Sequence, residues 1–410
     1  MQLKRVAVTG IGAVSPYGKG TGTLFASLAE GKSGISRHED LERFAELGPR
    51  VAGIVRDVDM TEVPRKHRRS MSPMSVYALM AAQEAIAQAA LPEEILAGGR
   101  AGVIMGSTMG SVVTIEEFFR EYVDRGSLEQ MKSVLFFRIM GHSIASNVAL
   151  ALGVTGRVLA PTAACSTSCQ AIGLAYEAIA TGKQDAVLCG GADEYHPLAT
   201  GTFDLMLAAS TAYNTDPERT PRPFDIGRDG VVCSEGAGVL LLESFASARA
   251  RGAKILAEVA GFASLSDSSS IANPDPEPLF RCMRAALQEA KIAPEEVSYV
   301  NAHATATVQG DIAESAAIAM LFGNRTPVSS LKGHLGHTMA ASGALESAAC
   351  VEMLRRHMLV PTLNLEEPDP RCGGIDLVRE NREHPVSVIV KNNFALGGIN
   401  CSLVLRGYND

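Results

Sequence analysis

The sequence predicts an α/β protein that contains two similar halves, with sheets covered by helices on both faces. The chain has 410 residues, more than one ordinary hydrophobic core accommodates. Short apolar segments alternate with segments of helical periodicity, an order that favours sheets packed between helices. One series of elements also occurs twice along the chain, which indicates an internal duplication.

The N-terminal segment begins with a short apolar strand over 5–9, followed by a glycine-rich loop over 10–18. The loop lacks the G-x-G-x-x-G spacing of a dinucleotide-binding turn and the acidic residue that follows such a turn. We therefore interpret its glycines as positions of close backbone packing. A short helix is expected over 24–30. The polar residues 37–70 are expected to form an irregular surface insertion.

The repeat begins after this insertion. Its first copy has a helix over 75–90, a Pro-Glu-Glu turn and a buried strand over 101–105. Its second copy has a helix over 279–290, another Pro-Glu-Glu turn and a strand over 298–302. Each copy continues with a small-residue helix, a glycine, a strand and a further helix.

The last strand-to-helix turns of the two copies lie around Cys165 and His337. We place the two halves at residues 1–252 and 253–410, joined by a short polar helix over 244–252. A duplication of this kind brings the two turns to a pseudo-twofold axis. Catalytic groups from the two halves would then meet there.

Composition excludes several classes of function. The formal net charge of −8 argues against nucleic acid as a partner. The eight cysteines show no paired short spacing, so a disulfide framework is not expected. The N-terminus does not resemble a signal peptide, and no apolar run reaches the length of a membrane span. We expect a cytoplasmic protein without membrane insertion, and no cofactor.

Cys165 is the first candidate for catalysis. It lies in Pro161-Thr-Ala-Ala-Cys-Ser-Thr-Ser168, between residues 158–160, interpreted as a buried strand, and a helix that runs on from Ser168. The positive end of a helix favours a thiolate, so we expect the pKa of this cysteine to be lowered. The surrounding small residues leave room for a substrate. The alternative is an ordinary buried cysteine in the core.

Two of the nine histidines occupy loop positions where α/β proteins place their active sites. His303 directly follows a buried strand, and His337 lies between a strand and a helix. Each alone is more often a structural histidine, but together with Cys165 they indicate a catalytic set. No metal site is expected, because the pair has no neighbouring carboxylate and no H-x-x-x-H helix.

Cys165, His303 and His337, with Lys332 five residues before the second histidine, resemble the Cys-His-His set of the condensing enzymes. More narrowly, the chain resembles the elongating β-ketoacyl-acyl-carrier-protein synthases, types I and II, of the thiolase superfamily. The similarity runs nearly end to end. It includes Val6-Ala-Val-Thr-Gly-Ile-Gly12, Arg222-Pro-Phe-Asp225, Glu235-Gly-Ala-Gly238 and Asn393-Phe-Ala-Leu-Gly-Gly-Ile-Asn400.

This resemblance implies a thiolase-like fold, five-layered αβαβα, which accounts for the repeat, and a homodimer, with a heterodimer with a related subunit as the alternative. It implies that Cys165 accepts an acyl group from acyl carrier protein as a thioester. Malonyl carrier protein then loses carbon dioxide, and its enolate carbon attacks that thioester. The product is a β-ketoacyl carrier protein of fatty acid or related polyene or polyketide biosynthesis.

The resemblance also assigns roles around the nucleophile. His303 and His337 would be neutral imidazoles that donate N–H to the malonyl thioester oxygen. The backbone N–H groups of Cys165 and Leu396 would form the oxyanion hole, and Phe394 would shape the space where the carboxylate departs. Lys332 and Glu346 match positions that organise the histidines, and a purely structural ion pair is the alternative for them.

The resemblance places the acyl pocket at Thr108, Met109, Phe136 and Phe137. Three departures from the family pattern bear on acyl specificity. Leu396 replaces a second phenylalanine at the gate, Thr108-Met109 replaces Gly-Ile at the pocket wall, and His303 is followed by Ala-Thr-Ala-Thr. These changes keep a specialised polyene or polyketide ketosynthase open as an alternative to fatty acid synthesis.

A basic cluster, Arg65-Lys-His-Arg-Arg69, stands out on an acidic chain. By itself such a run is usually a solvated surface. With the resemblance, Arg65, Lys66, Arg68 and Arg69 match a surface that docks the acidic acyl carrier protein.

Two other functions remain open. A thiolase or starter synthase has the same fold but needs a second catalytic cysteine, for which Cys401 is a weak candidate, or an asparagine where His337 stands. A chain-length partner subunit resembles the family but lacks the active cysteine.

Overall fold

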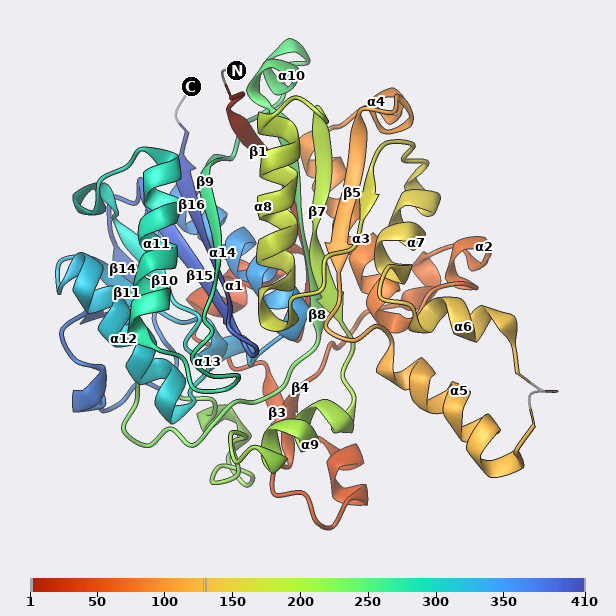
Figure 1. Ribbon diagram of the computed structural model, residues 1–410, viewed down its shortest axis with the longest axis horizontal. Helices are drawn as coiled ribbons and strands as arrows, with labels where there is room; N and C mark the ends of the chain where they lie inside the picture. The colour runs from red at the N-terminus through yellow and green to blue at the C-terminus, as the bar shows by residue number, and fades with distance from the viewer. Residues whose placement is uncertain (1–2, 128, 130, 409–410) are drawn as a thin grey trace.

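The structure, a computed structural model, describes residues 3–127, 129 and 131–408 of the chain (Figure 1). A twelve-stranded sheet runs through the whole molecule. Its first part contains, in order across the sheet, β6 (Val158–Leu159), β5 (Ala101–Gly106), β7 (Ala186–Asp193), β8 (Gly236–Ser244) and β1 (Val6–Ser15). Its second part contains β11 (Pro327–Ser329), β10 (Tyr299–Asn301), β15 (Val388–Ala395), β16 (Ile399–Gly407) and β9 (Ala257–Ser266).

The two parts of the sheet have the same strand order and the same strand directions. β5 runs parallel to β6 and β7, and β10 runs parallel to β11 and β15. β8 is antiparallel to both β7 and β1, and β16 is antiparallel to both β15 and β9. β1 and β9 pair with each other and join the two parts. The predicted internal duplication is therefore confirmed; the boundary at residue 252 stays a prediction.

Helices cover the sheet in layers (Figure 1). α3 (Pro73–Ala89) and α7 (Ser143–Leu152) pack on the outer face of the first part, and α11 (Pro276–Ala290) and α12 (Val308–Phe322) cover that of the second. Between the two parts lie α8 (Thr167–Ala180) and α14 (Ser342–Arg356), which pack against each other in the central hydrophobic core. The order helix, sheet, helix, sheet, helix is the thiolase-like architecture expected from the sequence.

Shorter elements decorate this body. The further helices are α1 (Thr21–Ala29), α2 (Arg65–Arg68), α4 (Glu93–Ala97), α5 (Val112–Arg125), α6 (Ser133–Ile139), α9 (Pro197–Leu205), α10 (Phe245–Ala250) and α13 (Lys332–Leu335). The further strands are β2 (Gly18–Lys19), β3 (Ile35–Arg37), β4 (Val51–Gly53), β12 (Met358–Leu359), β13 (Asp376–Leu377) and β14 (Arg382–Glu383). In Figure 1, α5 and α6 project away from the body at lower right.

Three expectations about local structure were wrong in detail. β1 continues through the glycine-rich segment to Ser15, rather than ending at residue 9. Residues 37–70 are not wholly an irregular surface, because β4 pairs with β3 and buries Val51. β6 is not buried: it is an edge strand, and Val158 and Leu159 are each 39% exposed.

The interpretation of the first glycines as positions of close packing is confirmed. A Cβ atom on Gly10 would lie 2.0 Å from the carbonyl oxygen of Ala85, and one on Gly12 would lie 1.8 Å from that of Ala81. Both carbonyls belong to α3, which therefore packs directly against the backbone of β1.

Among the described residues, no single helix has the length and apolar composition of a membrane span. Only α6 and α7 taken together reach it, and the pair is bent by 106°.

Candidate active site

The nucleophile candidate lies where the chain turns into a central helix. Cys165 belongs to a short 3₁₀ turn, Ala164–Ser166, that leads directly into α8. Ala164 adopts a positive φ of 47°, an uncommon conformation for a residue with a Cβ atom and one that recurs at functional sites. The cysteine therefore lies at the N-terminal end of the helix, as the sequence predicted.

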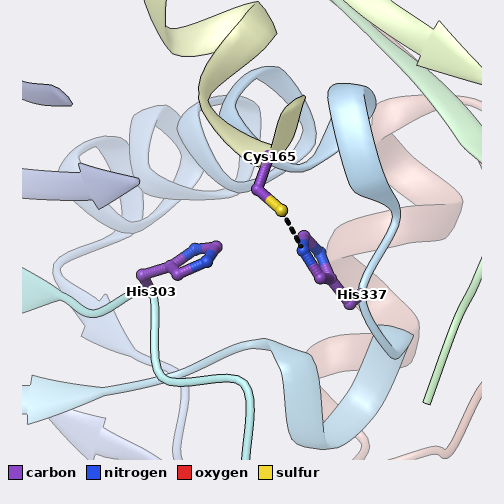
Figure 2. Close-up of side chains that lie close together, drawn as sticks. All are labelled: Cys165, His303 and His337. Carbon is purple, nitrogen blue, oxygen red and sulfur yellow. Dashed lines mark hydrogen bonds between the residues drawn. The ribbon is translucent and has the colours of Figure 1, made fainter. Parts of the chain in front are cut away.

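The two histidines reach the same place from the second half. His303 follows β10, and His337 lies between α13 and the 3₁₀ turn Met339–Ala341 that precedes α14. Figure 2 shows the three side chains pointing toward one another. His337 Nε2 lies 2.8 Å from Cys165 Sγ, and the two imidazole ring centroids are 5.3 Å apart. All three side chains are buried.

A cavity of about 280 Å³ opens onto this triplet. Cys165, His303 and His337 line it together with Phe394 and Leu396. Its other walls come from the end of α9 and from loops around residues 229–231, 267–274 and 304–310. A substrate that enters the cavity thus meets the sulfur and both imidazoles.

Burial raises the pKa of the Cys165 thiol to about 11, opposite to the lowered pKa expected from the helix end. The Lys332 ammonium lowers this pKa, as do the backbone N–H groups of Leu396 and Cys165, but removal from water outweighs them. Our expectation of a lowered pKa was wrong because burial could not be read from the helix pattern. These two N–H groups are the ones that the family resemblance assigns to the oxyanion hole.

Both histidines are neutral. Burial, reinforced by the positive charge of Lys332, holds the pKa of His303 and of His337 well below the usual value. The Nδ1 atom of His337 accepts the backbone N–H of Met339 at 3.3 Å. A neutral imidazole carries one proton, so the proton of His337 resides on Nε2, directed at Cys165.

Three buried charges lie behind the histidines. Lys332 Nζ contacts Glu346 Oε1 at 2.5 Å, and Lys391 on β15 contacts the other carboxylate oxygen. All three side chains are at most 2% exposed. The positive charges of the two lysines oppose protonation of the nearby imidazoles.

The ligand atoms of Cys165, His303 and His337 all lie within 4.8 Å of one another, a spacing that could hold a metal ion. The positive field of Lys332 and Lys391, which lowers the pKa of both histidines, also opposes a cation. A site without metal stays our prediction.

The structure does not bring every predicted site residue to the cavity. Thr108 and Met109 follow β5, and Phe136 and Phe137 lie on α6; none of the four lines the cavity. Their assignment to an acyl pocket stays a prediction. Cys401, considered as a second catalytic cysteine, lies on β16 near Ser264, outside the cavity lining.

The basic cluster forms α2 and its end. Arg65, Lys66 and Arg69 are exposed, Arg68 is half-buried, and none of the four forms an ion pair among the described residues. These side chains lie near α7 and do not line the cavity. Docking stays a prediction.

Sequence reasoning missed several residues that hold the site in place. The Glu314 carboxylate accepts the backbone N–H groups of His303 and Ala304 at 2.9 and 2.7 Å. The Asp193 carboxylate accepts the N–H groups of Thr108 and Ala340 and so links β5 to the His337 loop. Lys391 was also missed, although a charged residue within the apolar run Val388-Ile-Val-Lys391 was a visible signal.

Comparison with known proteins agrees with this geometry. Residues 3–248 match the family model for the beta-ketoacyl synthase N-terminal domain, and residues 256–366 match that for the C-terminal domain. The chain is 34% identical to 3-oxoacyl-[acyl-carrier-protein] synthase 1 of Escherichia coli (strain K12) over 412 residues, covering 100% of both chains.

Solved structures agree as well. A crystal structure of a beta-ketoacyl synthase from Burkholderia phymatum STM815 has a TM-score of 0.96 and 42% identity, covering 99% of this chain and 100% of that one. The ishigamide ketosynthase/chain length factor has a TM-score of 0.92 and 32% identity, with the same coverage. The resemblance found in the sequence is thereby confirmed: the chain belongs to the β-ketoacyl synthase family of condensing enzymes.

Proposed function

We propose that the protein condenses a Cys165-bound acyl group with malonyl-acyl-carrier-protein, with loss of carbon dioxide, to give β-ketoacyl-acyl-carrier-protein. The observation that carries this proposal is the meeting of one thiol and two neutral imidazoles at a single cavity. The carrier as substrate is supported by the name of the E. coli relative.

In the first half-reaction, the Cys165 sulfur attacks the carbonyl carbon of the acyl thioester. The bond from that carbon to the carrier sulfur breaks, and the carrier leaves as a thiol with the proton from Cys165. Negative charge develops on the carbonyl oxygen. The N–H groups of Cys165 and Leu396, which lower the pKa of the Cys165 thiol, would stabilise it.

In the second half-reaction, the malonyl carboxylate leaves as carbon dioxide and its bonding electrons form an enolate. The enolate oxygen needs hydrogen-bond donors in a dry site. His337 Nε2–H is such a donor, and His303 approaches from the other side of the sulfur (Figure 2). The enolate carbon then attacks the acyl thioester, and the Cys165 sulfur leaves as a thiolate, which takes up a proton from solvent to regenerate the thiol.

The direct test is malonyl dependence. Purified protein is given an acyl carrier protein charged with an acyl chain, together with malonyl-carrier or acetyl-carrier. We expect a product two carbons longer, and carbon dioxide in equal amount, only with malonyl-carrier. Condensation with acetyl-carrier at a similar rate would favour the thiolase-like alternative.

A partner-subunit role is the second function considered, because one structural relative is a ketosynthase/chain length factor. Such a subunit needs no nucleophile, whereas Cys165 here is in hydrogen-bond contact with His337. The same relative supports a specialised pathway as the alternative to fatty acid synthesis. Carriers with acyl chains of graded length would separate the two pathways by the length that acylates Cys165 fastest.

A homodimer is part of this proposal. Among the described residues no strand pairs with the outer edge of β6, and Val158 and Leu159 on it are exposed. α5 also presents Phe119, Tyr122 and Val123 to solvent, each at least 50% exposed. A second copy that covers both features would pair the edge and bury the apolar face. One chain has a mass of 43.2 kDa, and sedimentation of the purified protein should give twice this value. A mass equal to one chain would instead favour the heterodimer with a related subunit.

The eight cysteines are all free and buried, which supports a reducing compartment such as the cytoplasm.

A further inference from the structure

Asn393 on β15 connects the buried charges to His303. Its Oδ1 atom lies 2.7 Å from Lys391 Nζ, and its Nδ2 atom lies 3.4 Å from His303 Nδ1. Asn393 and Lys391 are fully buried, and the histidine is 7% exposed. The chain of contacts thus runs from Glu346 through Lys391 and Asn393 to the imidazole.

Lys391 determines which way the Asn393 amide faces. An ammonium only donates hydrogen bonds, so the atom that faces it must be the amide oxygen. All three hydrogens of Lys391 have acceptors, namely Glu346 Oε2, the carbonyl of Asn392 and Asn393 Oδ1. Rotation of the amide by 180° would place its NH₂ group against a buried cation, an arrangement that costs free energy.

With the amide so oriented, its NH₂ group faces His303. The amide nitrogen lies 3.4 Å from His303 Nδ1, 3.1 Å from Ser342 Oγ and 3.2 Å from the carbonyl oxygen of Cys165, so its two hydrogens are shared among these three acceptors. An imidazole nitrogen that accepts a hydrogen bond carries no proton. The proton of neutral His303 then resides on Nε2, the same tautomer as in His337.

We propose that Asn393, oriented by Lys391, is a positioning residue that holds His303 in its Nε2–H tautomer, so that this nitrogen can donate to the enolate oxygen. Neither residue touches the reacting atoms in this account; both act through His303. The inference rests on the proposed decarboxylative function for its role in catalysis. The tautomer itself can be measured without turnover.

The decisive variant is Asn393→Asp, which exchanges the donor facing His303 for an acceptor. The carboxylate accepts a hydrogen bond from Nδ1–H, so the single proton of the neutral His303 imidazole moves to Nδ1. Nε2 then carries no proton and cannot donate to an enolate. We expect the rate of malonyl-carrier decarboxylation at neutral pH to fall about 100-fold, which is the effect of losing one hydrogen-bond donor to an oxyanion. Acylation of Cys165 should change much less.

The pH profile separates this role from a structural one. The carboxylate introduced by Asn393→Asp stabilises the imidazolium, in which both nitrogens carry protons, so decarboxylation by the variant should rise as the pH falls below neutral. The parent should show no such rise. The titratable groups that face His303 are Cys165, Glu314, Lys332, His337 and Lys391. None of these is altered in the variant.

Three further measurements complete the test. The ring-nitrogen chemical shifts of His303, assigned with a His303→Gln variant, should report Nε2–H in the parent and Nδ1–H in Asn393→Asp. Lys391→Met should slow decarboxylation in the parent and much less in an Asn393→Leu background, because the part of its effect that runs through Asn393 is already lost there. The matched control Asn381→Asp, on the exposed surface, should leave decarboxylation unchanged.

An Nδ1–H tautomer in the parent, or an Asn393→Asp profile parallel to that of the parent, would overturn the inference. Failure of the parent to form any β-ketoacyl product would instead overturn the proposed function, and the tautomer measurement would still stand.

Discussion

His337 Nε2 lies 2.8 Å from Cys165 Sγ, although 172 positions of sequence separate the two residues. The contact joins the turn before α8 to the turn before α14, the corresponding places of the two halves. Because His337 Nδ1 accepts the N–H of Met339, Nε2 is a hydrogen-bond donor at the sulfur, not a base that removes its proton. In the proposed reaction, His337 therefore stabilises negative charge.

His337→Ala should therefore slow decarboxylation more than acylation. Loss of one donor to a developing oxyanion costs about 100- to 1,000-fold in rate. Acylation depends on the N–H groups of Cys165 and Leu396, which the variant retains, so we expect it to fall less than about tenfold. Carbon dioxide release and intact mass measure the two steps separately. Decarboxylation at the parental rate would contradict the role.

Lys332→Met should make Cys165 less reactive. The Lys332 ammonium lowers the pKa of the thiol against the effect of burial, so its removal raises that pKa further and reduces the thiolate fraction. Glu346 keeps Lys391 as its partner, so no carboxylate is left unpaired. We expect alkylation of Cys165 by iodoacetamide to slow roughly tenfold at a fixed alkaline pH.

The control for this substitution is Lys254→Met, at an exposed position. In both the parent and the control, the alkylation rate should rise with pH without a plateau until the thiol pKa of about 11 is approached. A plateau near neutral pH would show that the thiol is acidic and that burial does not dominate.

Charge reversal of the basic cluster, Lys66→Glu with Arg69→Glu, should weaken carrier docking. Both side chains are exposed, so the attraction they exert is long-ranged and sensitive to salt. We expect the KM for acyl-carrier to rise about tenfold at low salt and the difference to shrink at high salt. The KM for small acyl thioesters should not change in this variant, and the KM for acyl-carrier should not change in the Lys254→Glu control. Equal rises in the KM for acyl-carrier and for small thioesters would show that the cluster is a solvated surface and not a docking site.

His334→Met should improve stability in acid. His334 is fully buried, and neither ring nitrogen has a hydrogen-bond partner among the described residues. Burial lowers its pKa to about 3, so between about 6.5 and 3 the unfolded chain binds a proton that the folded chain does not. Stability therefore falls as the pH drops through this window.

Methionine removes both the proton uptake and the unpaired nitrogens. The free energy of unfolding should rise by about 1–3 kcal/mol at neutral pH, and the advantage should grow on acidification. The midpoint of urea unfolding at several pH values measures it. An identical loss of stability in acid for parent and variant would show that His334 does not titrate as the burial implies.

The sequence was sufficient for the architecture because the pattern that specifies it is local. Two copies of helix, Pro-Glu-Glu turn and strand were visible in the residues, and the two parts of the sheet share one order and one set of directions. Cys165, His303 and His337 were found because each follows a strand in the repeat. Their convergence followed from the pseudo-symmetry, not from any single motif.

The sequence could not show how deeply each side chain is buried or which residues from distant parts of the chain contact it. The pKa of Cys165 depends on burial in a site that His337, far away in the chain, helps to form. β6 was expected to be buried because Val158 and Leu159 are apolar, yet its place at the sheet edge exposes them. The link from Lys391 through Asn393 to His303 required the register of β15 against its neighbours.

The most direct test of the account is the location of the acyl group. Protein incubated with an acyl carrier protein carrying a defined acyl chain, then digested and analysed by mass spectrometry, should bear one acyl group, on the peptide that contains Cys165. The adduct should be absent in Cys165→Ala and should be lost from the parent when malonyl-carrier is added. An adduct on any other cysteine, or an unmodified Cys165, would contradict the account.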